Sequence, residues 1–220
     1  MDKTIFIGKK TCEISFIFAF TFGILKILIG LQLIPYPQDL YWFSLPSLFV
    51  APAFLITTIC IDILVRKELR KWTNSAWILA TINCIVIIMF YFSQPGLLNP
   101  ENLKWSNRSL EKFVFEQPMI PRTIHHYSYI LLSSSSLMLA FAFRKSKIKW
   151  LFPSLLLHGL FIPFLFLSYL FPQFYWMRFG WLMVLAIVIF NLNKFFKILD
   201  RKIKESPKGK LEVLPWLIDL

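Results

Sequence analysis

The sequence predicts an all-α membrane protein, built as a bundle of six transmembrane helices. Hydrophobic residues make up 57% of the chain and the mean hydropathy is +0.61, a composition typical of membrane proteins. Six apolar segments each approach the ~20 residues that a helix needs to cross a bilayer core. Basic residues lie in short runs between these segments, which is the pattern that orients membrane proteins. The net charge of +12 therefore does not predict a nucleic-acid partner.

The six spans are expected to form one transmembrane domain, residues 1–193. The first apolar run follows three lysines, as in a signal peptide, but it continues to about Leu33 and shows no small-residue cleavage site. We therefore interpret it as a retained span. The break at Pro172 is the least distinct, because apolar residues nearly bridge it. The expected spans are residues 13–34, 43–65, 75–93, 124–143, 148–171 and 174–193.

The distribution of lysine and arginine predicts that both termini are cytoplasmic, in a plasma or inner cell membrane. With six spans, the N-terminus, the 66–72 and 144–149 connections and the C-terminal tail share one side, and they carry three, four, four and seven basic residues. Lys26 lies within a span, and the opposite side carries five basic residues, namely Lys104, Arg108, Lys112, Arg122 and Arg178. Because Lys and Arg resist translocation, the richer side is expected to be the cytoplasm.

Two segments outside the spans are also expected to contact the membrane. The long external connection, residues 94–122, is predicted to contain a short interfacial helix at Leu110–Phe115. Residues 194–220 are predicted to form a basic amphipathic cytoplasmic tail, and its first part, 194–204, is expected to lie along the anionic inner leaflet. The apolar end of the tail, Leu211–Leu220, is predicted to contact the lipid bilayer or a membrane-protein partner.

Polar side chains from five of the six spans are expected at similar depth, near the middle of the membrane. Lys26 lies about halfway along the first expected span, and a buried lysine is costly unless it is paired, neutralised or hydrated. We expect its ammonium group to meet Asn83 and Ser133 or Ser136. Most of the serines from 133 to 136 are otherwise expected to bond to their own backbone carbonyls. The candidate ligand-binding residues are Lys26, Asn83, Ser133, Ser136 and His158.

A second candidate cluster lies at the outer start of the fourth span, and consists of Arg122, His125, His126 and Tyr129. An ordinary interfacial belt of Arg, His and Tyr has the same composition. His125 and His126 point about 100° apart on a helix, so they cannot both ligate one metal without distortion, and no metal site is predicted. Haem b held by His126 and His158 is disfavoured because the two differ by about 12 Å in depth. No cofactor is predicted.

No sequence motif assigns an activity or a family. The chain has no GxSxG, HExxH, P-loop or Rossmann glycine pattern, so no catalytic residue is predicted. The leading hypothesis is a non-enzymatic membrane protein, a small-solute carrier or ligand-binding component that uses the polar layer. One alternative is a structural subunit of a larger membrane complex. Another is a redox or lipid-modifying membrane enzyme that uses His125, His126 or His158.

Overall fold

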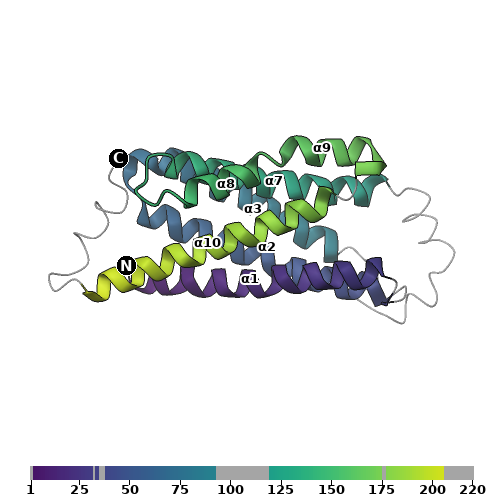
Figure 1. Ribbon diagram of the computed structural model, residues 1–220, viewed down its shortest axis with the longest axis horizontal. Coiled ribbons are helices and arrows are strands. Elements are labelled where there is room, and N and C mark those ends of the chain that lie inside the picture. The colour runs from purple at the N-terminus through teal and green to yellow at the C-terminus, as the bar shows by residue number, and fades with distance from the viewer. Residues whose placement is uncertain (1, 32, 35–37, 93–118, 175–176, 206–220) are drawn as a thin grey trace.

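The computed structural model describes residues 2–31, 33–34, 38–92, 119–174 and 177–205, and every regular element that it assigns there is helical (Figure 1). The interfacial helix expected within residues 94–122 and the apolar end of the tail, Leu211–Leu220, lie outside the described residues. The α-helices are α1 (Asp2–Gly30), α2 (Gln38–Leu64), α3 (Arg70–Phe92), α7 (Met119–Phe143), α8 (Leu151–Gly159), α9 (Ile162–Leu170) and α10 (Met177–Glu205), with short 3₁₀ helices η1 (Lys67–Leu69) and η3 (Pro172–Phe174).

The helices lie along the long axis of the molecule (Figure 1), and their contacts close a ring. Each packs on its neighbour in chain order, α1 on α2, α2 on α3 and α3 on α7, and α7 packs on both α8 and α9. Helix α10 contacts α8 and α9 on one side and α1 on the other, which closes the ring. Because the ring encloses the inner faces of all these helices, polar side chains on those faces meet one another rather than lipid.

Five helical segments among the described residues are long and apolar enough to cross a membrane, so the chain is a multi-pass membrane protein by its helix composition. They are Lys3–Leu28, Pro46–Leu64, Lys67–Phe90, Leu151–Leu170 and Met177–Glu205. Six spans are not confirmed. Helix α7, which contains the expected span 124–143, falls short because histidine, tyrosines and a run of four serines lower its hydropathy.

The expected span 148–171 is a single helix in the prediction but two in the structure. Helix α8 ends at Gly159 and α9 begins at Ile162. Pro163 explains the break, because its ring removes a backbone N–H donor and clashes with the carbonyl four residues earlier, which belongs to Gly159. The two residues between the helices keep helical dihedral angles, so α9 continues in nearly the same direction as α8.

The first and last helices are longer than the spans predicted for them. Each has 29 residues, about 44 Å at the helical rise, whereas a bilayer core is about 30 Å thick. The extra turns of α1 and α10 pack on each other, and Lys9 Nζ lies 3.4 Å from Asp200 Oδ2 across the contact. Phe195, Phe196 and Leu199 are buried in the core. Residues 194–205 therefore continue α10 against the bundle, where we expected a segment lying on the inner leaflet.

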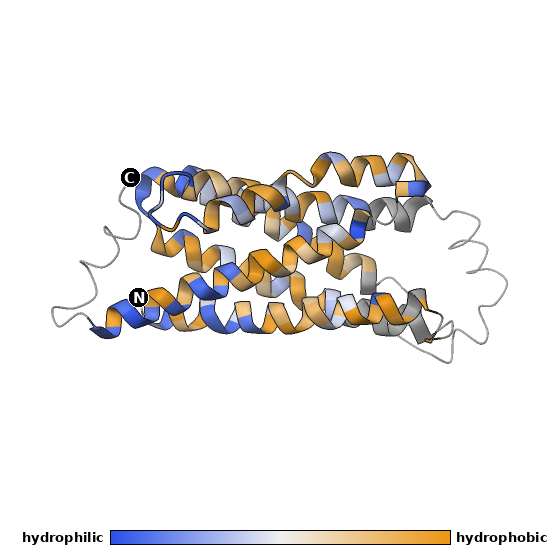
Figure 2. Cartoon of the chain, viewed as in Figure 1, coloured by the Kyte–Doolittle hydropathy of each residue, from blue (hydrophilic) through white to orange (hydrophobic). Residues whose placement is uncertain are grey.

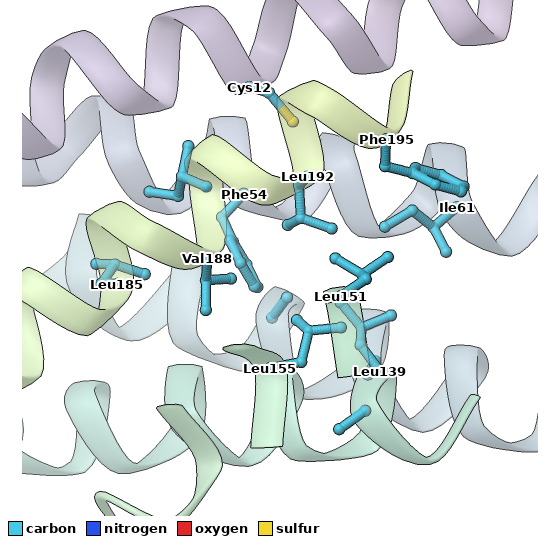
Figure 3. Packing of buried hydrophobic residues seen from close by; sticks show 14 of the residues in the cluster. Cys12, Phe54, Ile61, Leu139, Leu151, Leu155, Leu185, Val188, Leu192 and Phe195 are labelled. Carbon is cyan, nitrogen blue, oxygen red and sulfur yellow. The ribbon is translucent and has the colours of Figure 1, made fainter. Parts of the chain in front are cut away.

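Apolar packing along the ring interior holds these helices together. Figure 3 shows side chains from distant parts of the chain meeting in one cluster, among them Phe54, Leu155, Leu192 and Phe195. Hydrophilic residues gather at the end of the molecule where α1 begins and α10 ends, and the α7–α8 connection lies at the same end (Figure 2). The start of α10 lies towards the opposite end (Figure 1).

Candidate functional site

A small cavity lies inside the ring where α1, α2, α3, α7 and α10 converge. Its volume is about 40 Å³, and most of its lining is apolar. The polar or partly polar residues of its lining are Ser47, Asn83, Ser128, Tyr129 and Trp181. Asn83 is 2% exposed, and its side-chain oxygen has no hydrogen-bond partner among the described residues. Since a buried amide oxygen is costly when it accepts nothing, a donor that came within reach of Asn83, a residue of the cavity lining, would be stabilised.

Lys26 lies beside this cavity, but nearer to the end of its helix than the sequence predicted. Helix α1 begins at Asp2 and ends at Gly30, so Lys26 is about one turn from its end and not halfway along it. Its Nζ lies 5.5 Å from the ring centroid of Phe22 and 5.8 Å from that of Tyr129. Both rings line the cavity. The expected hydrogen bond from Lys26 to the Asn83 oxygen is not formed.

Arg178 brings a second buried positive charge to the same region. It is the second residue of α10 and is 5% exposed. Its Nη2 lies 2.6 Å from Nε2 and 3.1 Å from Nδ1 of His126, so the guanidinium donates to the imidazole ring. His126 also has Ser168 Oγ 3.4 Å from Nε2 and packs edge-on against the Tyr169 ring. Helices α7, α9 and α10 are thus joined by polar contacts around Arg178.

The two cations are linked by shared neighbours. Lys26 Nζ lies 5.4 Å from the ring centroid of Phe179, the residue after Arg178. Tyr129, whose ring also faces Lys26, lies one helical turn from His126 on α7. An ammonium group over aromatic faces is stabilised by the ring quadrupoles, which reduces the cost of burying it. Lys26 (8% exposed), His126, Tyr129 and Arg178 form what we call the cationic cluster.

A further series of polar and aromatic contacts runs from the cavity towards the middle of the bundle. The Trp181 indole packs on Tyr129, with centroids 4.3 Å apart, and its Nε1 donates to Ser133 Oγ at 2.8 Å. His158 also packs on Trp181, with ring centroids 5.3 Å apart, and its Nδ1 lies 2.9 Å from Ser136 Oγ. His158 is fully buried, and its Nε2 has no hydrogen-bond partner among the described residues.

The serines of α7 therefore bind neighbouring helices. Ser133 accepts from α10, Ser136 contacts His158 of α8, and Ser135 donates to the Ala76 carbonyl of α3 at 2.8 Å. We expected most of these serines to bond to their own helix, and for these three that expectation was wrong. Ala76 has a small side chain, so α3 approaches α7 closely enough for its backbone carbonyl to be reached.

The structure regroups the two sets of candidate residues. Lys26 joins His126 and Tyr129, which the sequence analysis placed in a different cluster. Asn83 lines the cavity, while Ser133, Ser136 and His158 lie behind Trp181. The backbones of Arg122 and His125 belong to α7, but their side chains lie outside what the structure describes.

Sequence reasoning missed two residues that organise the site. Arg178 was counted as an external charge that orients the chain, although it falls within the expected span 174–193. That position was the signal that could have found it, because arginine inside a span is unusual and points to a function or a specific contact. Trp181 was not singled out, and nothing in its local sequence distinguishes it from other apolar neighbours on α10.

No family model, curated protein or solved structure matches this chain. The part of the chain that the structure describes also contains no group of three or more His, Cys, Asp or Glu residues that could hold a metal ion. The function must therefore be inferred from the chain's own geometry, and the cavity with its cationic cluster is the arrangement that offers a binding chemistry.

Proposed function

We propose that this protein is a multi-pass membrane protein of the cell membrane, with both termini cytoplasmic, that binds a small polar solute in the cavity between its helices. It acts as a solute carrier or as the ligand-binding component of a membrane system. The observation that carries the proposal is the Asn83 oxygen, which is buried at the cavity and has no hydrogen-bond partner among the described residues. A polar group left in that state favours an occupant that donates to it.

The position of the cavity supports this role. Transporters and membrane receptors bind solutes between helices, where several helices contribute side chains to one site. Here α1, α2, α3, α7 and α10 all contribute to the lining. A solute bound there would contact the first and last helices of the ring at once, so its binding would be coupled to how the ring closes.

Cysteine accessibility tests the proposal without knowledge of the solute. In a background in which Cys12, Cys60 and Cys84 are alanine, Ser128→Cys places a thiol in the cavity lining. Ser135→Cys is the matched control, since it makes the same change on the same helix at a fully buried position that does not line the cavity. The probe is methyl methanethiosulfonate, a small uncharged reagent that reacts with the thiolate form.

We expect Ser128→Cys to react faster than Ser135→Cys in folded protein, and the two rates to become equal in denaturant. Thiolate is formed only where water reaches the sulfur, so a faster rate at position 128 means a hydrated cavity open to small molecules. Equally slow reaction at both positions in folded protein would show that the cavity does not admit a molecule of the reagent's size, and would refute the proposal.

A further inference from the structure

The connection between α7 and α8, residues 144–149, is short and strongly basic, and we call it the basic turn. Its lysine and arginine side chains are all exposed, and they are Arg144, Lys145, Lys147 and Lys149. The sequence contains no aspartate or glutamate from residue 117 to residue 199, so the helices on either side of the turn supply no negative charge of their own. The turn therefore presents a concentrated positive charge at one end of the bundle.

Backbone hydrogen bonds give the basic turn a defined shape. The backbone N–H of Ser146 donates to the carbonyl of Phe143 at 3.0 Å, and Ser146 Oγ accepts from the N–H of Ile148 at 3.1 Å. Ile148 is buried in the hydrophobic core, which fixes the turn to the bundle. Because the backbone is already held in place, a ligand that binds these side chains does not have to order a long loop.

The position of the basic turn in the chain places it at the level of the lipid headgroups. It leads directly into α8, which begins Leu151–Leu170, a segment long enough and apolar enough to cross a membrane. Trp150, at the end of the turn, is half-buried, and tryptophan is enriched at the boundary between membrane and water. Lys194 of α10 has its Nζ 4.8 Å from the Trp150 ring centroid, so a second element adds a positive charge there. Hydrophilic residues mark the same end in Figure 2.

An exposed apolar face follows the basic turn. Leu157, Leu160 and Phe164 recur at helical spacing along α8 and α9, and each is more than 40% exposed. Leu160 lies nine residues after the start of α8, about 14 Å along the helix, which is close to half of the ~30 Å bilayer core. The positive charge and the apolar face are thus spaced like the headgroup and the acyl chains of one phospholipid.

We propose that the basic turn binds the headgroup of an anionic phospholipid whose acyl chains lie along α8. Arginine and lysine donate charge-assisted hydrogen bonds to phosphate oxygens, and lipids with a net negative charge are attracted to clusters of such residues beside a membrane span. Any phospholipid can cover the apolar face of α8, so the charge of the headgroup is what the site selects. The proposal is independent of the cavity and of the solute proposed for it.

Native mass spectrometry of the full-length protein, released from detergent micelles, tests the proposal. The probes are phosphatidylglycerol and phosphatidylcholine with identical acyl chains, so that only the headgroup differs. We expect phosphatidylglycerol to bind more tightly. The double variant Arg144→Gln, Lys149→Gln should weaken its binding about 30-fold, because each basic residue near the membrane surface contributes a factor of roughly five. Binding of phosphatidylcholine should change much less.

A matched variant controls for net charge. Arg201→Gln combined with Lys204→Gln also removes one arginine and one lysine, and both of these side chains are exposed. They lie on the last turns of α10, about 10 Å or more beyond Lys194 along the helix. This variant should bind phosphatidylglycerol as the parent does. Thermal unfolding of each variant without added lipid, followed by tryptophan fluorescence, shows whether it is folded.

Several results would overturn the proposal. One is equal affinity of the parent protein for the two lipids, a comparison that needs no variant. Another is an equal loss of phosphatidylglycerol binding in both double variants, which would show that net charge alone matters. Displacement of the lipid by an equal concentration of glycerol 3-phosphate would show a site for soluble phosphates instead. If phosphatidylglycerol binds only after residues 206–220 are deleted, the chain's own tail, which carries Glu212 and Asp219, occupies the turn.

Discussion

Replacing Gly159 with alanine tests the packing that positions His158. Gly159 is the last residue of α8, and a Cβ added there would lie 2.7 Å from Leu137 Cβ and 3.1 Å from Leu137 Cα on α7. Carbon atoms in good contact are about 3.5–4.0 Å apart, so the two helices would have to separate by about 1 Å. One of the atoms that the new Cβ would meet, Leu137 Cα, belongs to the backbone, which cannot rotate away as the tip of a side chain can.

Such overpacking typically costs about 1–3 kcal/mol. In a protein of this size each kcal/mol lowers Tm by about 2–4 °C. The displacement should also lengthen the 2.9 Å contact between His158 Nδ1 and Ser136 Oγ, because His158 precedes Gly159 on the same short helix. Thermal unfolding of the purified protein in mild detergent, followed by tryptophan fluorescence, measures the change, since Trp181 is buried beside His158.

Gly23→Ala is the control for this experiment. A Cβ at Gly23 would meet Leu182 Cδ2 at 3.4 Å, close to ordinary contact and at the end of a flexible side chain. Glycine within a helix is less stable than alanine by roughly 0.5–1 kcal/mol, so this variant should unfold at the parent temperature or slightly above it. If Gly159→Ala unfolds at the same temperature as Gly23→Ala, α8 does not pack against α7 as described.

Three further predictions concern other parts of the chain. Trp181→Phe removes the indole donor to Ser133 and should destabilise the protein by about 0.5–1.5 kcal/mol. In that background, Ser133→Ala should cost little more stability. Additive losses in this double-mutant cycle would mean that the pair does not interact. For orientation, a membrane-impermeant thiol reagent applied outside cells should label Leu103→Cys or Ser106→Cys and spare Leu69→Cys or Ser206→Cys, because basic residues concentrate on the side of the latter pair. The reverse labelling would invert the topology. Deleting Leu211–Leu220 should release a co-purifying membrane protein or make the chain easier to extract from membranes. If the deletion has neither effect and protease removes the segment freely from folded protein, the segment binds neither a partner nor the bilayer.

The sequence by itself determined the class of the protein and much of its helical organisation. Apolar runs of about 20 residues need no knowledge of the fold to be recognised, because in lipid the backbone must satisfy its hydrogen bonds within the helix. The break between α8 and α9 was not predicted, but the local sequence indicates it, since the Pro163 ring clashes with the carbonyl of Gly159 one turn earlier. The polar candidates Lys26, Asn83 and His158 were likewise visible as polar residues inside apolar segments.

Only the tertiary structure decided which of these residues meet. Partnership between helices depends on where each helix begins, how it is rotated and which neighbour it packs on, and no local pattern fixes these quantities. Helix α1 begins at Asp2 and ends at Gly30, so Lys26 lies about one turn from its end, in the cationic cluster, and not halfway along it. The closure of the ring by α10 brought Arg178 to His126 and Trp181 to Ser133, across more than forty positions of sequence. The sequence therefore identifies the candidate residues, and the packing of the ring decides which of them form the site.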